Sequence, residues 1–384
     1  MIAFAAQILA FCLLLLLLLL LQLQTTMAGD SSFSGVFDHG SHGVTLVKVD
    51  EAPRKCSSAA AAKKTDDDTA PAGGAPPKPL LVAAPCDAGV YPVVVFLHGY
   101  LAYNSFYSQL FEHVASHGFV VVGPQLFLGC ELILSNNFDA KMLYTMSGPD
   151  TTDEINSAAA VINWLAAGGL TSKLPPNVRA DATKISISGH SRGGKVAFAL
   201  ALGHANVSLR GGAGGATIAA LVAVDPVDGF AAGKQTPPPI LTYGGANSLR
   251  VPAPVMVIGT GLGGLARAAP LLPACAPPGV SHGEFYGECA APACHLVARD
   301  YGHTDMMDDV TPGARGLATR AVCRSGGARA PMRRFFGGAM VAFVKRWVEG
   351  EPELLDCVRA RPETAPVVLS AVEFRDEAIA NHSY

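Results

Sequence analysis

The pentapeptide Gly189-His190-Ser191-Arg192-Gly193 decides the fold of this chain. Residues 184–188, just before it, are a short run with β-branched side chains and predict a strand, whereas residues 195–202 predict a helix. Glycines two positions before and after the serine let the backbone turn sharply between these elements. A strand, Gly-x-Ser-x-Gly and a helix together predict a nucleophile elbow, which holds a serine hydroxyl clear of a sheet. The N-terminus of the helix would point at any anion that forms beside Ser191.

The rest of the chain alternates strands with helices. Continuous apolar runs at residues 93–97 and 119–122 are typical of strands buried on both faces of a parallel sheet. Further strands are predicted at residues 44–49, 80–83, 219–224, 255–258 and 295–298, and further helices at residues 151–165 and 335–348. The first of these helices opens with Thr151-Thr152-Asp153-Glu154, the pattern of a capping box. The alternation predicts the α/β class, with a mostly parallel central sheet flanked by helices.

One catalytic domain, from about residue 35 to 360, fits this pattern better than two domains. Residues 52–79 are small and polar and predict a low-complexity loop that carries no chemistry. We assign residues 361–384 to a C-terminal tail and residues 1–27 to an apolar leader.

The leader is compatible with three fates. Its apolar run ends near Leu21 and suits a secretory signal peptide, although it lacks a positively charged start. The same run is long enough to anchor the chain in a bilayer. Translation from Met27 would remove it altogether. The glycosylation sequons at Asn206 and Asn381 matter only if the chain enters the secretory pathway.

Composition excludes some partners. The 28 basic and 31 acidic residues give a net charge of −3 without a basic cluster, so nucleic acid is not an expected partner. Charged residues make up 15% of the chain, which suits a protein that meets an apolar substrate or a membrane. Cysteine and histidine lack the spacing of a metal site, so no metal or other cofactor is expected. Eight cysteines remain without Cys12, an even number compatible with disulfides, and we expect most to be buried free thiols.

A reactive serine needs a base and a carboxylate that orients it, and in this fold the chain order is serine, acid, histidine. His303 follows the last predicted strand, which is where the base belongs. His98 and His190 lie beside glycines in tight turns, and structural roles suffice for both.

The acid is harder to assign. No carboxylate follows the strand at residues 255–258, but Asp225 ends the preceding strand, at the edge of an α/β sheet where ligands gather. Asp225 is therefore favoured over Asp228, which we interpret as a turn residue before a glycine, and over Glu284. Asp305 is discounted because it lies two residues beyond the base.

Two backbone N–H groups should form an oxyanion hole. One belongs to Arg192, directly after the nucleophile, and the other to Tyr100, in the loop after residues 93–97. Gly99 would let this loop approach the substrate closely. The side chain of Arg192 is expected to be partly packed and exposed.

Taken together, these motifs resemble the plant chlorophyllases, α/β-hydrolases that cleave the phytyl ester of chlorophyll to chlorophyllide and phytol. The matching segments are Phe96-Leu97-His98-Gly99-Tyr100, Tyr103-Asn104-Ser105-Phe106-Tyr107, Ser116-His117-Gly118-Phe119, Gly189-His190-Ser191-Arg192-Gly193-Gly194, Val224-Asp225-Pro226-Val227 and Tyr301-Gly302-His303-Thr304-Asp305-Met306. In that family the corresponding serine, aspartate and histidine form a catalytic triad, which the resemblance places at Ser191, Asp225 and His303.

The resemblance implies that the partner is chlorophyll or a related tetrapyrrole ester, with magnesium belonging to the substrate, and that the chain is located in the chloroplast. The leader instead favours the endoplasmic reticulum or the secretory pathway, and either the leader or the apolar substrate favours membrane association. Two other functions remain open. A general carboxylesterase or lipase would share the elbow, and a hydrolase-fold ligand-binding protein would share the fold without turnover.

Overall fold

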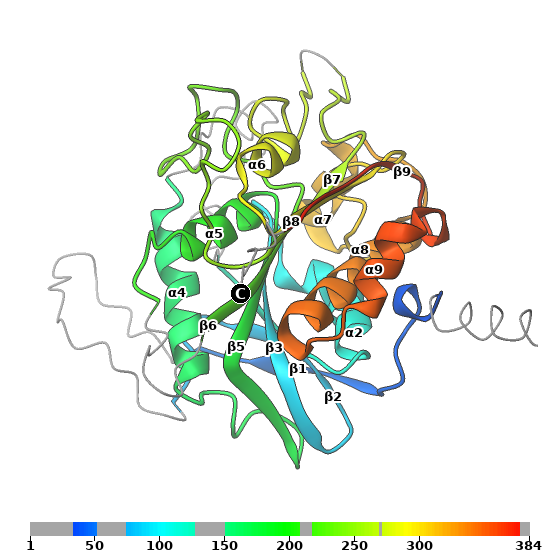
Figure 1. The fold of residues 1–384 in the computed structure, drawn as a ribbon. Coiled ribbons are helices and arrows are strands. Elements are labelled where there is room, and N and C mark those ends of the chain that lie inside the picture. The colour runs from blue at the N-terminus through cyan, green and yellow to red at the C-terminus, as the bar shows by residue number, and fades with distance from the viewer. Residues whose placement is uncertain (1–33, 52–73, 127–149, 208–216, 269–270, 377–384) are drawn as a thin grey trace, which may run out of the picture.

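The computed structural model describes residues 34–51, 74–126, 150–207, 217–268 and 271–376. In these residues one nine-stranded sheet has the order β1-β2-β4-β3-β5-β6-β7-β8-β9 (Figure 1). The strands are β1 (Val44–Val49), β2 (Leu80–Pro85), β3 (Gly89–Leu97), β4 (Val120–Pro124), β5 (Val178–His190), β6 (Thr217–Val224), β7 (Val255–Thr260), β8 (Ala293–Ala298) and β9 (Leu369–Arg375). The six strands from β4 to β8 in this order run parallel. Strand β2 is antiparallel to β1 and β4, and β9 is antiparallel to β8.

Helices connect the strands and cover both faces of the sheet. The α-helices are α2 (Ser108–Ala115), α4 (Thr152–Ala166), α5 (Arg192–Ala201), α6 (His282–Glu288), α7 (Gly313–Ala321), α8 (Arg329–Val344) and α9 (Glu353–Ala360). Shorter turns are η1 (Ser34–Phe37), η2 (Asn104–Tyr107), the π-helical η3 (Lys345–Glu349) and η4 (Pro362–Thr364). The predicted α/β architecture, with a mostly parallel sheet flanked by helices, is confirmed.

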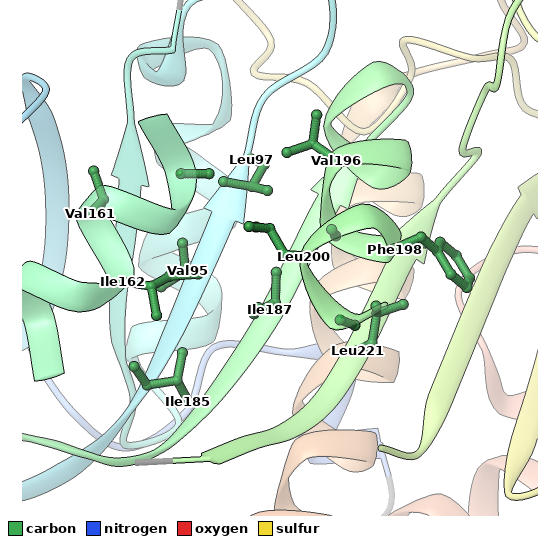
Figure 2. Close-up of a cluster of buried hydrophobic side chains, with 14 of the residues drawn as sticks. Val95, Leu97, Val161, Ile162, Ile185, Ile187, Val196, Phe198, Leu200 and Leu221 are labelled. Carbon is green, nitrogen blue, oxygen red and sulfur yellow. The ribbon is translucent and has the colours of Figure 1, made fainter. Parts of the chain in front are cut away.

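Strand β3 shows why its sequence is apolar without interruption. Val95 points into one core, beneath α4 and α5 (Figure 2), and Val93 belongs to the same core. Val94 and Phe96 point into a second core on the opposite face, where α2 and α8 pack. Successive side chains of a strand alternate between faces, so a strand covered on both sides needs an apolar residue at every position.

Two assignments near the C-terminus differ from prediction. Residues Leu369–Arg375, which we assigned to a tail, pair with β8 as an edge strand of the main sheet. The helix predicted at residues 335–348 begins at Arg329 and ends in the π-helical turn η3. Residues 52–73 of the predicted loop and the whole apolar leader lie outside the described residues.

The predicted capping box at the start of α4 is wrong, although the helix begins where expected. The Thr151 hydroxyl donates to the carbonyl oxygen of Pro237 at 2.9 Å and makes no capping hydrogen bond to the helix, whose first N–H donates to the Asp150 carboxylate at 3.0 Å. The Glu154 carboxylate pairs with the Arg192 guanidinium instead. Both side chains that a capping box would use, those of Thr151 and Glu154, instead contact residues that are distant in sequence.

The described cysteines include one disulfide, between Cys275 and Cys323. Cys86, Cys289, Cys294 and Cys357 are free thiols, and of these Cys289 and Cys294 are buried. Among the described residues, no helix has the length and apolar character that a membrane span requires.

Candidate active site

Ser191 lies in a strained turn between β5 and α5. Its backbone has φ 56° and ψ −123°, a conformation that residues other than glycine rarely adopt. A Cβ atom on Gly189 would lie 2.3 Å from the carbonyl oxygen of Gly193, and one on Gly193 would lie 2.2 Å from that of Leu97. Larger residues would therefore collide with neighbouring backbone at both positions. The geometry is that of the predicted nucleophile elbow.

His303 reaches Ser191 from the loop after β8. Its Nε2 lies 2.9 Å from the Ser191 Oγ, and its Nδ1 lies 2.8 Å from the Asp225 Oδ2. All three residues are buried, and Asp225 is completely inaccessible to solvent. The structure thus brings together the three residues that the sequence nominated as nucleophile, base and acid.

Asp225 directly follows β6 and adopts a positive φ of 43°. Its carboxylate accepts hydrogen bonds from the Thr260 hydroxyl at 2.6 Å and from the Thr260 backbone N–H at 3.2 Å. Burial raises the pKa of this carboxyl, but the hydrogen bond and charge of His303, with help from His282 and Thr260, outweigh burial and lower the pKa below its ordinary value. Asp225 is therefore held as a carboxylate facing the imidazole.

The competing carboxylates have other partners. Asp228 is wholly buried, forms an ion pair with Lys195 at 2.9 Å and accepts hydrogen bonds from the backbone N–H groups of Ile240 and Leu241. Our interpretation of Asp228 as a simple turn residue is therefore wrong. Glu284 caps its own helix α6 through Ser281. Asp305 holds the loop of the base, because it accepts from the backbone N–H groups of residues 302 and 326.

The loop after β3 lies directly against the nucleophile. A Cβ atom on Gly99 would lie 2.9 Å from the His190 Nδ1 and 3.4 Å from the Ser191 Cβ. Tyr100 directly follows Gly99, and Arg192 directly follows Ser191. The two residues nominated for an oxyanion hole are therefore each next in sequence to one of these two closely packed residues. The expectation of an exposed Arg192 side chain is wrong, because the residue is 8% exposed and its guanidinium is paired with Glu154.

Sequence reasoning missed three residues that hold the site in place. Thr260, the last residue of β7, donates a hydrogen bond to Asp225. The feature of the sequence that could have identified it is a polar residue at the end of an apolar strand. His190 and Tyr107 form a buried hydrogen bond of 2.7 Å behind the base. In the sequence Tyr107 belongs to a matching motif and His190 to a tight turn, and no local pattern joins residues 83 positions apart.

Within the described ranges, no group of three or more histidine, cysteine or acidic side chains is arranged to hold a metal ion.

Comparisons with known proteins agree with this geometry. The family model described as Chlorophyllase matches residues 32–376. The chain is 44% identical over 344 residues to chlorophyllase-2 of Arabidopsis thaliana, covering 89% of this chain and 98% of that protein. It is 41% identical to chlorophyllase-1 of the same plant, over 78% of this chain and 86% of that one. A chloroplastic chlorophyllase-1 of Citrus unshiu is 39% identical over 78% and 81% of the two chains. By this match over most of its length, the chain belongs to the chlorophyllase family.

Proposed function

We propose that the chain hydrolyses the phytyl ester of chlorophyll to chlorophyllide and phytol by serine acyl transfer. The observation that carries the proposal is the continuous hydrogen-bonded series Asp225, His303, Ser191, with contacts of 2.8 and 2.9 Å. Membership of the chlorophyllase family supplies the substrate class. The enzyme is then a carboxylic ester hydrolase with the α/β-hydrolase fold.

In the first half of the reaction, the His303 Nε2 takes the proton of the Ser191 hydroxyl while Oγ attacks the ester carbonyl. The carbonyl electron pair moves onto oxygen, and the backbone N–H groups of Tyr100 and Arg192 stabilise that oxyanion. Asp225 holds the imidazole in the tautomer with Nδ1–H and stabilises its positive charge. His303 then gives the proton to the phytol oxygen as the C–O bond breaks.

In the second half, the propionyl group of the chlorin remains attached to Ser191 as an acyl-enzyme. His303 removes a proton from water, which attacks the acyl carbon, and the second tetrahedral intermediate collapses to release chlorophyllide and the serine hydroxyl. We propose that these steps need groups of the chain alone, and that the magnesium belongs to the bound chlorophyll.

We also propose that the enzyme works at a membrane surface in the chloroplast. Several large apolar side chains are exposed on the segments that follow the carboxyl ends of β6, β7 and β8, at the edge that carries Asp225 and His303. They are Phe230, Leu265, Leu271, Val310 and Leu317, exposed by 46%, 46%, 82%, 79% and 69%. Exposed apolar side chains on these segments suit a substrate dissolved in lipid. The chloroplastic names of the Citrus relatives support the location.

A turnover assay with three substrates tests the function. Chlorophyll a, pheophytin a and a p-nitrophenyl ester are offered to the wild type and to Ser191→Ala. We expect the wild type to release phytol from chlorophyll and Ser191→Ala to lose activity by several orders of magnitude. Turnover of the p-nitrophenyl ester alone would identify a general esterase, and turnover of none would favour a ligand-binding protein.

Two measurements test the location and the membrane association. N-terminal sequencing of the mature protein shows whether the leader is retained, removed or never translated. Asn206 is exposed, and a glycan on its side chain would exclude direct import into the chloroplast. Flotation with lipid vesicles should recover the wild type, and Leu271→Ser with Val310→Ser should weaken that recovery.

A further inference from the structure

The two residues nominated for the oxyanion hole touch each other through their side chains. The guanidinium carbon of Arg192 lies 5.3 Å from the centre of the Tyr100 ring, within cation–π range. Tyr100 belongs to the loop after β3, and Arg192 opens α5. The contact therefore joins two segments that must keep a fixed separation if their N–H groups are to bind one oxygen atom.

A buried carboxylate on a third element holds the guanidinium in place. The Arg192 Nε donates to the Glu154 Oε1 in an ion pair, and the Arg192 Nη2 donates to the carbonyl oxygen of Asp150 at 3.1 Å. Glu154 is 3% exposed and lies in the first turn of α4. An ion pair this deeply buried is weak support for stability as such, because desolvation offsets much of the attraction. Its geometric effect, a guanidinium fixed in one orientation, remains.

The loop that carries Tyr100 needs such a support. It turns through Leu101, whose φ of 57° is unfavourable for a residue with a side chain, and Gly99 precedes it. Stabilisation of an oxyanion is steep in distance, since the donors must lie within about 2.7–3.1 Å of the developing charge. A small shift of the Tyr100 N–H away from Ser191 would therefore reduce the stabilisation of the transition state, although substrate could still enter the site.

We propose that Glu154 is a positioning residue for the oxyanion hole: it fixes Arg192, and the guanidinium of Arg192 fixes Tyr100. The inference rests on the proposed serine mechanism, to which it adds a residue that touches neither substrate nor nucleophile. It predicts that Glu154 acts on kcat rather than on substrate binding.

The test compares Glu154→Gln with Asp153→Asn. The glutamine keeps the size of the side chain and an oxygen that can accept from Nε, but it removes the charge. Asp153 is the matched control, because it is an exposed carboxylate in the same helical turn. Both variants and the wild type are assayed with a p-nitrophenyl ester and with chlorophyll, and melting temperatures are recorded.

Inhibition by an alkyl trifluoromethyl ketone distinguishes a positioning role from a merely structural one, because a structural role would leave the inhibition constant unchanged. The Ser191 Oγ adds to its carbonyl carbon, His303 takes the serine proton, and the carbonyl electron pair becomes an oxyanion in the hole. We expect Glu154→Gln to lower kcat by between about 10- and 100-fold with KM within about twofold, and to raise the inhibition constant of the ketone by a similar factor. Asp153→Asn should match the wild type.

Folded Glu154→Gln with unchanged kcat and unchanged ketone inhibition would overturn the proposal. If Glu154→Gln does not fold, Tyr100→Leu takes its place, because it removes the ring and leaves the ion pair, and the same pattern is expected. The p-nitrophenyl ester and ketone measurements decide this proposal even if chlorophyll proves not to be the substrate. Conversely, chlorophyll turnover that is equal in Glu154→Gln and wild type would leave the proposed function standing without the positioning role.

Discussion

The His190 Nε2 donates a hydrogen bond of 2.7 Å to the backbone carbonyl oxygen of His303. A carbonyl oxygen can only accept, so the proton of a neutral His190 lies on Nε2 and its Nδ1 must accept. The Tyr107 hydroxyl donates to that Nδ1 at 2.7 Å, and the Gly99 N–H donates to the tyrosine oxygen at 3.2 Å. One series of buried hydrogen bonds therefore runs from the oxyanion loop to the base. Burial, reinforced by the neighbouring His303, lowers the pKa of His190 to about 3, which keeps the ring neutral near pH 7.

Tyr107→Phe breaks this series without changing the ring that fills the core. The His190 Nδ1 and the Gly99 N–H lose their partner in a buried place, which costs about 1–3 kcal/mol for each group left unpaired. We expect the free energy of unfolding to fall by about 2–6 kcal/mol and kcat by about tenfold. Denaturant unfolding and steady-state kinetics measure the two effects.

Tyr91→Phe is the control, because it removes a hydroxyl whose partner is the carbonyl oxygen of Asp87, outside the site. Its kcat should equal that of the wild type. A Tyr107→Phe enzyme with wild-type kcat would mean that the series holds the fold but not the base.

Gly263 is predicted to be essential for the orientation of the acid. A Cβ atom there would lie 2.6 Å from the Asp225 Oδ2 and 2.4 Å from the Thr260 Oγ1, closer than real Cβ contacts allow. Gly263→Ala should therefore displace the carboxylate and lower kcat by about 100-fold. At Gly264 the nearest atom would be 3.6 Å away, so Gly264→Ala should keep activity. Equal kinetics for the two alanine variants would contradict this view of the acid.

The sequence predicted the elbow and the parallel sheet because both are encoded by local patterns. Glycines flank Ser191, and strands such as β3 are apolar at every position. The sequence-based predictions were wrong for Arg192, which was expected to be exposed, and for Asp228, which was expected to lie in a simple turn. Both residues are buried and form an ion pair with a residue of another element: Arg192 with Glu154, and Asp228 with Lys195. Charged residues are rarely buried unless paired, and a partner that is distant in sequence cannot be recognised from spacing.

Asparagine substitutions at Asp225 and Asp228 should have opposite signatures. Asp225→Asn keeps the shape of the acid but favours the wrong imidazole tautomer, so kcat should fall by about 10⁴-fold with little change in melting temperature. Asp228→Asn leaves the Lys195 ammonium buried without its carboxylate, which costs about 3–5 kcal/mol of stability. Kinetics and thermal unfolding of both variants measure the contrast. A stable, inactive Asp228→Asn beside an active Asp225→Asn would reverse the assignment.

The disulfide between Cys275 and Cys323 joins the segment after β7, where Gly263 packs against Asp225, to the segment after α7, which packs against the loop of the base. Ala276, next to the first cysteine, donates its N–H to the Gly263 carbonyl oxygen, and Gly302 packs against the backbone of residue 324, next to the second cysteine. Replacing both cysteines by serine should lower the free energy of unfolding by about 2–4 kcal/mol and also lower kcat. Cys86→Ser, which changes an exposed free thiol, should do neither. Unaltered kinetics in the double variant would limit the bridge to a role in stability.

Acid pH should destabilise the fold through buried histidines. Burial, together with the positive charges of His117 and Arg334, lowers the pKa of His113 to about 3, although its hydrogen bond to the Val36 carbonyl oxygen acts in the opposite direction. An unfolded histidine has a pKa of about 6.5, so between these values the unfolded chain binds the extra proton. The free energy of unfolding is thus unaffected by this group above about pH 6.5 and falls as the pH drops from there toward 3.

His113→Gln tests this linkage, because glutamine can still donate to Val36 but does not titrate. Each such histidine contributes a slope of up to about 1.4 kcal/mol per pH unit. We therefore expect denaturant unfolding between pH 5 and 6.5 to show a steep rise in stability for the wild type, with a slope smaller by about 1 kcal/mol per pH unit in His113→Gln. His113 lies in α2 and contacts Val36, His39 and His117, which are not part of the site, so the variant should keep its kcat at pH 7. A slope that is identical in both proteins would show that His113 takes up its proton equally in the folded and unfolded states.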